Sequence, residues 1–248
     1  MSAFSNGMPG LPLRLAFVGL AMFGAIHASG AEAETILDEH FDAPLKAQDW
    51  AYFPDASHAR AIEGALTMTV DAAEGAMGMV AMTSTAPMPR LNFLRNSVEI
   101  ELDGLALQGA PAPGEQVFFV RIGSDSPKYG QAASLLQIRI DGAGVFYCSV
   151  VDRGAAKPSA LYQGKISWPL SRMKVGIDPG GLKIAWNDAG GEKTAAASFA
   201  ARPQAWETSV PWLVLVCQRN APAGEVAATL RGISIRSTPL AEGSASPQ

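Results

Sequence analysis

The sequence has few charged residues and no excess of basic ones. Charged side chains make up 17% of the 248 residues, and 19 lysines and arginines stand against 23 aspartates and glutamates, a formal net charge of −4. A surface that follows a nucleic-acid backbone needs a basic excess. The charge balance therefore predicts that nucleic acid is not a partner of this protein.

Cysteine is scarce, and the common catalytic motifs are missing. The only two cysteines, Cys148 and Cys217, both lie inside apolar runs typical of strands. A disulfide in an exported protein and two small buried side chains explain them equally well. The sequence has no nucleophile elbow, phosphate-binding loop, Cys-x-x-Cys pair or His-Glu-x-x-His motif, and no loop has the dense ligand spacing of a calcium site. We therefore predict neither a metal nor another cofactor.

Long apolar runs are confined to the N-terminus. A polar leader ends at Arg14, apolar residues follow from Leu15 to Ile26, and small residues at 28–31 precede Glu32. The apolar run would form a helix of about 18 Å, too short for a bilayer core of about 30 Å. We expect residues 1–30 to be a signal peptide, with an uncleaved anchor as the alternative. Cleavage would leave a periplasmic or extracellular protein without membrane attachment.

Helix-forming patterns are almost absent from the rest of the chain. Short runs rich in β-formers alternate with glycine, proline, aspartate and asparagine, the pattern of an all-β sandwich or barrel. Asp141–Gly144 and Asp178–Gly181 each join two alternating runs, so each predicts a hairpin turn. We expect one β-sandwich domain over residues 31–236, and a disordered tail over 237–248 because that segment has little apolar surface. Strands are predicted at 35–41, 65–70, 77–83, 97–102, 116–122, 135–140, 145–151, 173–177, 182–186, 194–199, 212–218 and 228–236.

Four consecutive runs between residues 97 and 151 alternate with period two, so their side chains sort onto two faces. One face is apolar and is predicted to be core: Val98, Ile100, Leu102, Phe118, Val120, Ile122, Leu136, Ile138, Ile140, Phe146, Cys148 and Val150. The opposite face is mainly polar: Glu99, Glu101, Asp103, Val117, Phe119, Arg121, Leu135, Gln137, Arg139, Asp141, Val145, Tyr147 and Ser149. If the four strands pair as a meander in one sheet, the two glutamates lie near Arg121, with Gln137, Arg139 and Tyr147 beyond.

The order of several motifs resembles the concanavalin A-like jelly-roll sandwiches, which include laminin-G-type modules, legume lectins and laminarinase-like glucanases. The resemblance covers most of residues 35–236. It rests on Leu37–Phe41, Trp50, the Gly-x-Leu strand entry in Ile62–Leu66, Ser97–Glu101, the hairpin Lys174–Ile184 and the closing strand Leu230–Arg236. The resemblance implies two stacked antiparallel sheets with a concave face that often holds sugar. Members include lectins, hydrolases, lyases and adhesion modules, so the fold alone implies no activity.

Glu99, Glu101 and Asp103 stand at i, i+2 and i+4, which places their carboxyl groups on one face of a strand. Glucanases of the resembling fold use a Glu-x-Asp-x-Glu arrangement, nucleophile first and acid/base last, and a retaining pair needs carboxyl groups about 5–5.5 Å apart. Here the middle residue is glutamate and the last is the shorter aspartate. Glu99 and Glu101 are therefore candidate catalytic residues, while ordinary exposed alternation explains the same pattern.

The remaining polar residues of this face, Arg121, Gln137, Arg139 and Tyr147, together with Asp103, are candidate ligand-binding residues. An arginine offers a rigid fork of donors to the carboxylate of an acidic sugar. A lyase would also need a base, and Tyr147 would have to serve because neither His40 nor His58 lies in these strands. The alternative is that the two arginines pair with the two glutamates on a solvated surface, which contributes little to stability.

Tryptophans offer a further route to sugar binding. Trp186 shares a strand face with apolar neighbours, so it is predicted to be core. Trp50 and Trp206 lie in polar, loop-like contexts and are the better candidates for exposed platforms, although core packing is the commoner use of any one tryptophan.

Three functions remain open from the sequence. The first is a domain that binds a poly- or oligosaccharide on a concave polar sheet face. The second is a glycan-cleaving enzyme, a glycoside hydrolase or polysaccharide lyase, that uses the same face. The third is a structural or adhesion module whose polar face is only solvated.

Overall fold

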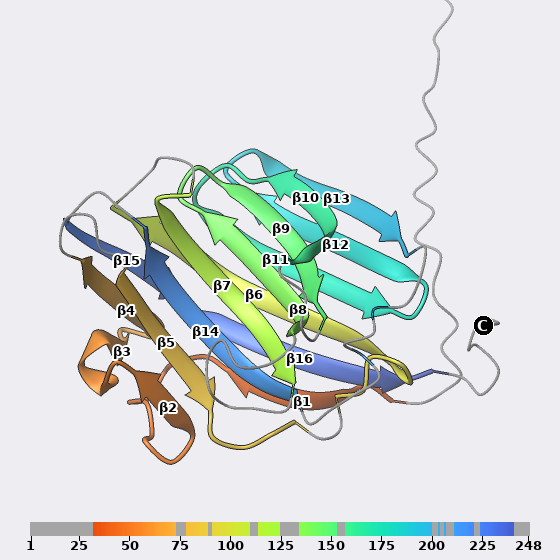
Figure 1. Ribbon diagram of the computed structural model, residues 1–248, viewed down its shortest axis with the longest axis horizontal. Coiled ribbons are helices and arrows are strands. Elements are labelled where there is room, and N and C mark those ends of the chain that lie inside the picture. Colours follow the sequence, from red (N-terminus) through yellow and green to blue (C-terminus); the bar gives the residue numbers. More distant parts are fainter. Residues whose placement is uncertain are drawn as a thin grey trace, which may run out of the picture.

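The computed structural model (Figure 1) describes residues 32–72, 78–88, 91–109, 114–124, 134–152, 157–199, 203, 206, 211–220 and 224–240. The predicted signal peptide and the residues after Leu240 lie outside this part. The described residues form sixteen strands and one short 3-10 helix, η1 (Ala56–His58). Within them, no helix has the length and apolar character needed to cross a membrane.

A nine-stranded antiparallel sheet forms one layer. Its strands run in the order β13 (Gly191–Ser198), β12 (Gly181–Asp188), β11 (Leu170–Asp178), β6 (Asn96–Gln108), β15 (Gly224–Leu230), β4 (Ala65–Ala72) and β3 (Ala59–Ile62). The first half of β6 also pairs with β16 (Gly232–Pro239), which pairs in turn with β1 (Glu34–Glu39). The long strand β6 is therefore the centre of this sheet.

A seven-stranded antiparallel sheet forms the other layer, stacked on the first (Figure 1). Its strands run in the order β10 (Ser159–Lys165), β9 (Val145–Val151), β8 (Ser134–Asp141), β7 (Gln116–Ser124), β14 (Pro211–Arg219), β5 (Gly78–Ser84) and β2 (Trp50–Phe53). The predicted all-β, two-sheet antiparallel sandwich is confirmed.

The core lies between the two sheets and is built by alternation along the strands. Every residue predicted to be core between 97 and 151 is at most 2% exposed. β11 and β12 add the same alternation, with Val175 and Ile184 paired across the ladder and both buried. Burial of one face on each layer is what holds the two sheets together.

Bulges adjust the alternation where the apolar pattern breaks period two. Leu102 and Leu105 are both 1% exposed although they are three residues apart, so one extra residue must separate them. Gly104 lies there with φ of +61°, opposite Arg231, whose amide donates to the Asp103 carbonyl at 2.9 Å. The sequence predicts a single strand over 228–236, and this irregularity divides it into β15 and β16.

The two predicted hairpin turns are confirmed. β8 and β9 are joined at Asp141–Gly144, where the Asp141 carboxylate accepts the Val145 amide at 2.9 Å. β11 and β12 are joined at Asp178–Gly181, where the Asp178 carboxylate accepts the Gly180 and Gly181 amides at 2.8 and 3.0 Å. Both aspartates therefore use their side chains to satisfy turn amides.

Two boundary predictions need correction. The tail was predicted to begin at Ser237, but β16 continues to Pro239, and Ser237 is 2% exposed and pairs with Val98. β2, β3 and β10 were not predicted from the sequence. They are edge or near-edge strands of four to seven residues with weak apolar alternation, so their pairing partners determine their conformation.

The two cysteines are free and fully buried. Cys148 lies on β9 and Cys217 on β14, which are separated by β8 and β7, so about 14 Å of sheet lies between them. A disulfide needs Cα atoms within about 7 Å. The sequence left open a disulfide or two small buried side chains, and the second explanation is the correct one.

Candidate functional site

The sandwich divides the predicted site between its two layers. β6, which carries Glu99, Glu101 and Asp103, belongs to the nine-stranded sheet, while β7, β8 and β9 belong to the seven-stranded sheet. The apolar sides of both sheets face the core, so their polar sides face away from each other. The predicted meander of four strands in one sheet is wrong, because the chain crosses to the other layer between β6 and β7.

The three acidic residues of β6 lie among basic residues of the neighbouring strands. Arg172 donates to Glu101 at 2.7 Å. Lys174 lies 3.0 Å from Glu99 and 3.5 Å from Glu101, and Arg231 lies 3.7 Å from Asp103. We call these six residues the charge ladder: Glu99, Glu101, Asp103, Arg172, Lys174 and Arg231.

Sheet register explains the charge ladder. Lys174 is directly opposite Glu101 on the β11–β6 ladder, and Arg172 is opposite Asp103. The hydrogen bond and the charge of Glu101 raise the pKa of Arg172 above its ordinary value. The sequence predicted, as one alternative, that Glu99 and Glu101 pair with arginines on a solvated surface. The two glutamates are paired, but their partners are Arg172 and Lys174 and not Arg121 and Arg139. Each of the three carboxylates has a cationic partner. This arrangement is the one expected if the three acidic residues only form a solvated surface.

The other four predicted residues do come together, on the outer side of the seven-stranded sheet. Arg121 is opposite Gln137 on the β7–β8 ladder, and Arg139 is opposite Tyr147 on the β8–β9 ladder. All four side chains are half-buried. We call this group the arginine face: Arg121, Gln137, Arg139 and Tyr147.

Arg139 and Tyr147 are in direct contact. The guanidinium carbon of Arg139 lies 5.8 Å from the centre of the Tyr147 ring, within the range of a cation–π interaction. Within the described part of the chain, Arg139 makes no ion pair, and neither Gln137 nor Tyr147 makes a side-chain hydrogen bond. The group therefore presents donors and acceptors together with an aromatic ring.

A row of side chains extends from the arginine face across the whole sheet. Direct pairing across the strands gives the order Gln163, Tyr147, Arg139, Phe119, Val216, Ala81 and Phe53. Ala81 and Val216 belong to a small apolar cluster with Val214, against which Phe119 packs. The row is polar at its β10 end and apolar at its β2 end. The sequence does not show that β14, β5 and β2 continue this face, because alternation gives the sides of a strand but not its neighbours.

Two residues assigned to the polar face have other surroundings. Leu135 is 2% exposed and packs in the main core, next to a register irregularity between Ser134 and Gln137. Asp141 is 5% exposed, and its carboxylate is used by turn amides at Gly114 and Val145. Neither side chain is available on the arginine face.

Neither Trp50 nor Trp206, the two candidates for exposed platforms, is one, and the core packing that the sequence favoured for any one tryptophan is what is found. Both side chains are 5% exposed and belong to the core. The Trp206 indole donates to the Leu135 carbonyl at 2.8 Å, and its ring lies 5.5 Å from those of Phe93 and Phe199. Trp186 is buried as predicted. The polar sequence around Trp206 does not show that its ring packs against Phe93, which is distant in sequence.

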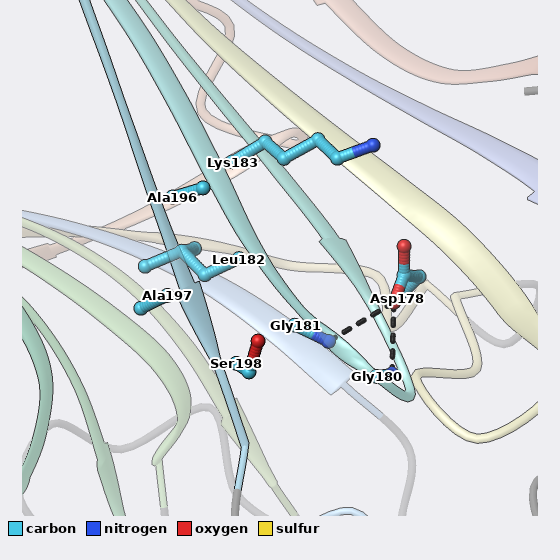
Figure 2. Close-up of a pocket in the computed structure, with 8 residues that line it drawn as sticks. All are labelled: Asp178, Gly180, Gly181, Leu182, Lys183, Ala196, Ala197 and Ser198. Atoms are coloured by element: carbon cyan, nitrogen blue, oxygen red, sulfur yellow. Dashed lines mark hydrogen bonds between the residues drawn. The ribbon is translucent and has the colours of Figure 1, made fainter. Parts of the chain in front are cut away.

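A separate pocket of about 310 Å³ lies at the ends of β12 and β13 (Figure 2). Asp178, the acidic group in its wall, already accepts the two turn amides drawn there. Leu182 points into the core side of the sheet while Lys183 points outward. Small side chains such as Ala196 and Ala197 form the rest of the wall. The pocket gathers no set of acid, base and aromatic groups.

Asp188 is the acidic residue with the most partners in the described chain. Its side chain is fully buried and accepts from Lys193 at 2.8 Å, from the Ser167 and Gly190 amides at 2.9 and 2.7 Å, and from the Trp186 indole at 3.2 Å. Burial raises the pKa of Asp188, but the hydrogen bonds from Lys193, Ser167 and Gly190 outweigh it and lower the pKa to about 2. The carboxylate therefore stays charged and fixes the ends of β12 and β13.

Metal ligands do not gather in the part of the chain that the structure describes, since no three histidine, cysteine, aspartate or glutamate side chains converge there. The charge ladder and the arginine face are thus the two arrangements of charged groups on which a function can be based.

Comparison with known proteins finds similarity in structure alone. No family model matches the sequence, and no curated protein matches it. A CBM2 module of the evolved Dit protein from Lactobacillus casei BL23 phage J-1 aligns with a TM-score of 0.58 at 8% identity, covering 85% of this chain and 98% of that module.

Two further structures show the range of proteins with this architecture. The lectin UEA-II, complexed with galactose, aligns with a TM-score of 0.53 at 10% identity, covering 84% of this chain and 98% of the lectin. Alginate lyase A1-II', of polysaccharide lyase family 7, aligns with a TM-score of 0.53 at 14% identity, covering 78% of this chain and 96% of the lyase. The order of strands and these alignments together show that the chain has the concanavalin A-like jelly-roll sandwich fold.

Proposed function

We propose that this protein binds carbohydrate on the outer side of its seven-stranded sheet, at the arginine face. The observation that carries the proposal is the group of Gln137, Arg139 and Tyr147. These three half-buried polar side chains lie side by side, and their hydrogen-bonding groups have no protein partner in the described chain. Side chains that fold to satisfy one another leave few such groups, so an adjacent set indicates a place where a ligand supplies the partners.

The chemistry of the group suits a sugar. A tyrosine ring offers an apolar surface to the C–H side of a sugar ring, and its hydroxyl offers a donor and an acceptor. The Gln137 amide and the Arg139 guanidinium add planar donors and acceptors for hydroxyl groups. The row from Gln163 to Phe119 spans about 14 Å across the strands, which favours an extended oligosaccharide over a single small molecule.

The proposal is tested by screening the purified protein on a panel of neutral and acidic glycans, followed by calorimetric titration of the best ligand. We expect Tyr147→Ala to weaken binding at least about tenfold, since it removes both the ring and a hydrogen-bonding group. Glu101→Gln is the matched control, because it removes a charged group of similar burial from the opposite surface and should leave the affinity unchanged. Binding to no glycan on the panel would contradict the proposal and favour the structural or adhesion module.

Cleavage of the bound glycan is the second candidate function, and the contact between Arg139 and Tyr147 favours a lyase among the cleaving enzymes. In such a step a base takes the proton next to a sugar carboxylate, a carbon–carbon double bond forms, and the glycosidic C–O bond breaks to release the leaving sugar as an alcohol. Tyr147, as a tyrosinate, would take this proton and then return it to the leaving glycosidic oxygen, while Arg139 would neutralise the carboxylate. Tyr147→Phe should then abolish formation of the unsaturated product while largely retaining binding, and the absence of that product from the unmodified protein would exclude this function.

Hydrolysis by Glu99 and Glu101 is tested independently. Glu99 and Glu101 both form ion pairs with Lys174, so we assign them no catalytic role. We expect Glu99→Gln and Glu101→Gln to leave any glycan turnover unchanged, and loss of turnover in either variant would move the active site to the charge ladder.

We also propose that the protein is exported with removal of residues 1–30. The polar leader, the short apolar run and the small residues that follow support this proposal. Expression of the full chain in a bacterial host, with N-terminal sequencing of the protein from the periplasm and medium, tests it. A mature N-terminus between residues 29 and 34 is expected, and recovery of the intact chain in the membrane fraction would contradict it.

A further inference from the structure

We propose that the glycan bound at the arginine face is acidic, and that its carboxylate or sulfate groups are recognised by Arg139 with Arg121 beside it. This inference rests on the proposed function, and it names the class of ligand for that site. It is carried by three observations: the distribution of charge between the two sheets, the surroundings of Arg139, and the geometry of its contact with Tyr147.

The two sheets differ strongly in charge. The strands of the nine-stranded sheet carry eleven acidic and six basic residues. The strands of the seven-stranded sheet carry four basic residues and one acidic residue, Asp141, whose carboxylate is buried in a turn. Arg219 is 6% exposed and lies on the core side of β14, so the three basic residues on the outer side are Arg121, Arg139 and Lys165. The protein as a whole has a net charge of −4. The outer side of the seven-stranded sheet is therefore basic although the protein is acidic. It attracts anions, and its strands carry no exposed carboxylate that would repel them.

The surroundings of the basic residues differ between the sheets in the same way. On the charge ladder, Arg172, Lys174 and Arg231 each lie within 4 Å of a carboxylate. Arg139 has no carboxylate partner in the described chain, although it is half-buried. A half-buried charge is costly when nothing opposes it, and a ligand anion would remove that cost.

The contact with Tyr147 holds the Arg139 guanidinium in place. The guanidinium carbon lies 5.8 Å from the centre of the ring, and the guanidinium makes no ion pair in the described chain, so its planar fork can donate two parallel hydrogen bonds to a ligand. A carboxylate matches this fork with both of its oxygens, and a sulfate ester does so with two of its three. Arg121 follows on the next strand, opposite Gln137, one pairing row away from Arg139.

The test compares one polysaccharide in two forms. Polygalacturonate and its carboxyl-reduced derivative differ only in the acidic group, and dextran sulfate with unsubstituted dextran gives the corresponding sulfate pair. We expect the acidic member of at least one pair to bind at least about tenfold more tightly than its neutral form at low salt, and the preference to shrink as salt is raised. The pair that shows the preference identifies carboxylate or sulfate as the recognised group.

Variants test whether Arg139 causes the preference for the acidic glycan. Arg139→Gln should remove most of the preference: it should weaken binding of the acidic form about tenfold more than binding of the neutral form, which loses only hydrogen bonds to hydroxyl groups. Arg139→Lys keeps the charge but loses the fork, so its affinity for the acidic form should lie between those of Arg139→Gln and the unmodified protein. Arg172→Gln, which removes an arginine from the charge ladder, is the control and should retain the full preference. Circular dichroism and thermal unfolding would confirm that each variant is folded.

The outcomes separate this inference from the function on which it rests. Equal binding of the acidic and neutral forms, with sensitivity to Tyr147→Ala, would overturn the acidic ligand and keep carbohydrate binding. An acidic preference that survives Arg139→Gln would also overturn the role given to the arginine face. Binding to neither form of any glycan would overturn both proposals.

Discussion

At the scale of single residues, Asp188 shows how this protein keeps a buried charge. The carboxylate accepts from the Lys193 amine and from two backbone amides, which hold it in its charged form. Asp141 uses the same solution in the β8–β9 turn. Arg139 differs from both, since its buried part is opposed only by the Tyr147 ring. This contrast is why Asp188 is assigned a structural role and Arg139 a binding role.

Replacing Asp188 should destabilise the protein in a manner that depends on pH. Asp188→Asn places an amide among amide and ammonium donors, at an expected cost of about 1–3 kcal/mol in the free energy of unfolding at pH 7. The folded pKa of about 2 lies below the ordinary value of 3.8, so the carboxylate stabilises the fold above about pH 4 and this contribution is lost as the pH falls toward 2. Urea unfolding at several pH values measures the difference.

The exposed Glu192 on the neighbouring strand provides the control for this prediction. Glu192→Gln should change the free energy of unfolding by less than about 0.5 kcal/mol at every pH. Two results would contradict a stabilising role of the Asp188 carboxylate. One is a loss in the free energy of unfolding for Asp188→Asn as small as that for Glu192→Gln, and the other is a loss for Asp188→Asn that stays constant between pH 5 and pH 2.

The charge ladder should matter little to stability. Arg172 and Lys174 are more than one third exposed, so water and salt compete with their contacts to Glu101. Glu101→Gln should therefore cost at most about 1 kcal/mol in the free energy of unfolding. Thermal unfolding at low and high salt checks this, and a larger loss that persists in high salt would show that the ladder is a structural network.

At the scale of elements, turns and bulges set the direction of each strand. The β8–β9 turn needs Gly144, because its φ is +82° and a Cβ atom there would lie 2.3 Å from the Ile166 carbonyl oxygen. The Gly144 carbonyl also accepts the Ile166 amide at 2.8 Å, which ties the turn to the segment after β10. This turn positions both strands that carry Arg139 and Tyr147.

Substitution of Gly144 should therefore be more harmful than a positive φ alone explains. Gly144→Ala is expected to lower the free energy of unfolding by more than about 2 kcal/mol, combining the left-handed backbone with the clash. Gly191, in the β12–β13 turn, has φ of +93° and open space around the Cβ position. Gly191→Ala should lose only about 1–2 kcal/mol, so chemical denaturation of the two variants isolates the clash. Equal losses would show that backbone conformation is the whole cost.

At the scale of the whole molecule, the stacking of two sheets creates two outer surfaces with different chemistry. One surface carries the charge ladder, in which acidic and basic residues are matched across β6, β11 and the β15–β16 junction. The other carries the arginine face and the apolar cluster around Val216. The strand order within the seven-stranded sheet separates the two cysteines by three strand spacings.

The cysteines should stay reduced and unreactive while the protein is folded. Burial raises the pKa of Cys148 and of Cys217 to about 12, so both are thiols at neutral pH. A thiol reagent should modify neither residue in the native protein and both after unfolding in guanidinium. The thermal unfolding midpoint should be the same with and without a reductant. Rapid modification of the native protein, or a midpoint that falls on reduction, would contradict the free, buried state.

Much of the fold was determined by the sequence alone. Every residue that period-two alternation assigned to the core between 97 and 151 is buried, because a strand places alternate side chains on opposite faces, whereas Leu105 and Leu135 were missed next to irregularities in the strands. The two Asp-to-Gly turns were recognised because their chemistry is local: an aspartate side chain and a glycine backbone satisfy the turn without help from distant residues. The order of motifs was also sufficient to identify the jelly-roll sandwich.

Only the tertiary structure decided which strands are neighbours. Nothing in the alternation of β6 shows that its polar side belongs to a different layer from that of β7, because each strand has two faces in either arrangement. That one fact separates Glu99 and Glu101 from Arg139 and gives them Arg172 and Lys174 as partners. It also buries Trp206 against Phe93. Local periodicity fixes the sides of a strand, whereas the partners of each side depend on contacts between residues far apart in the chain.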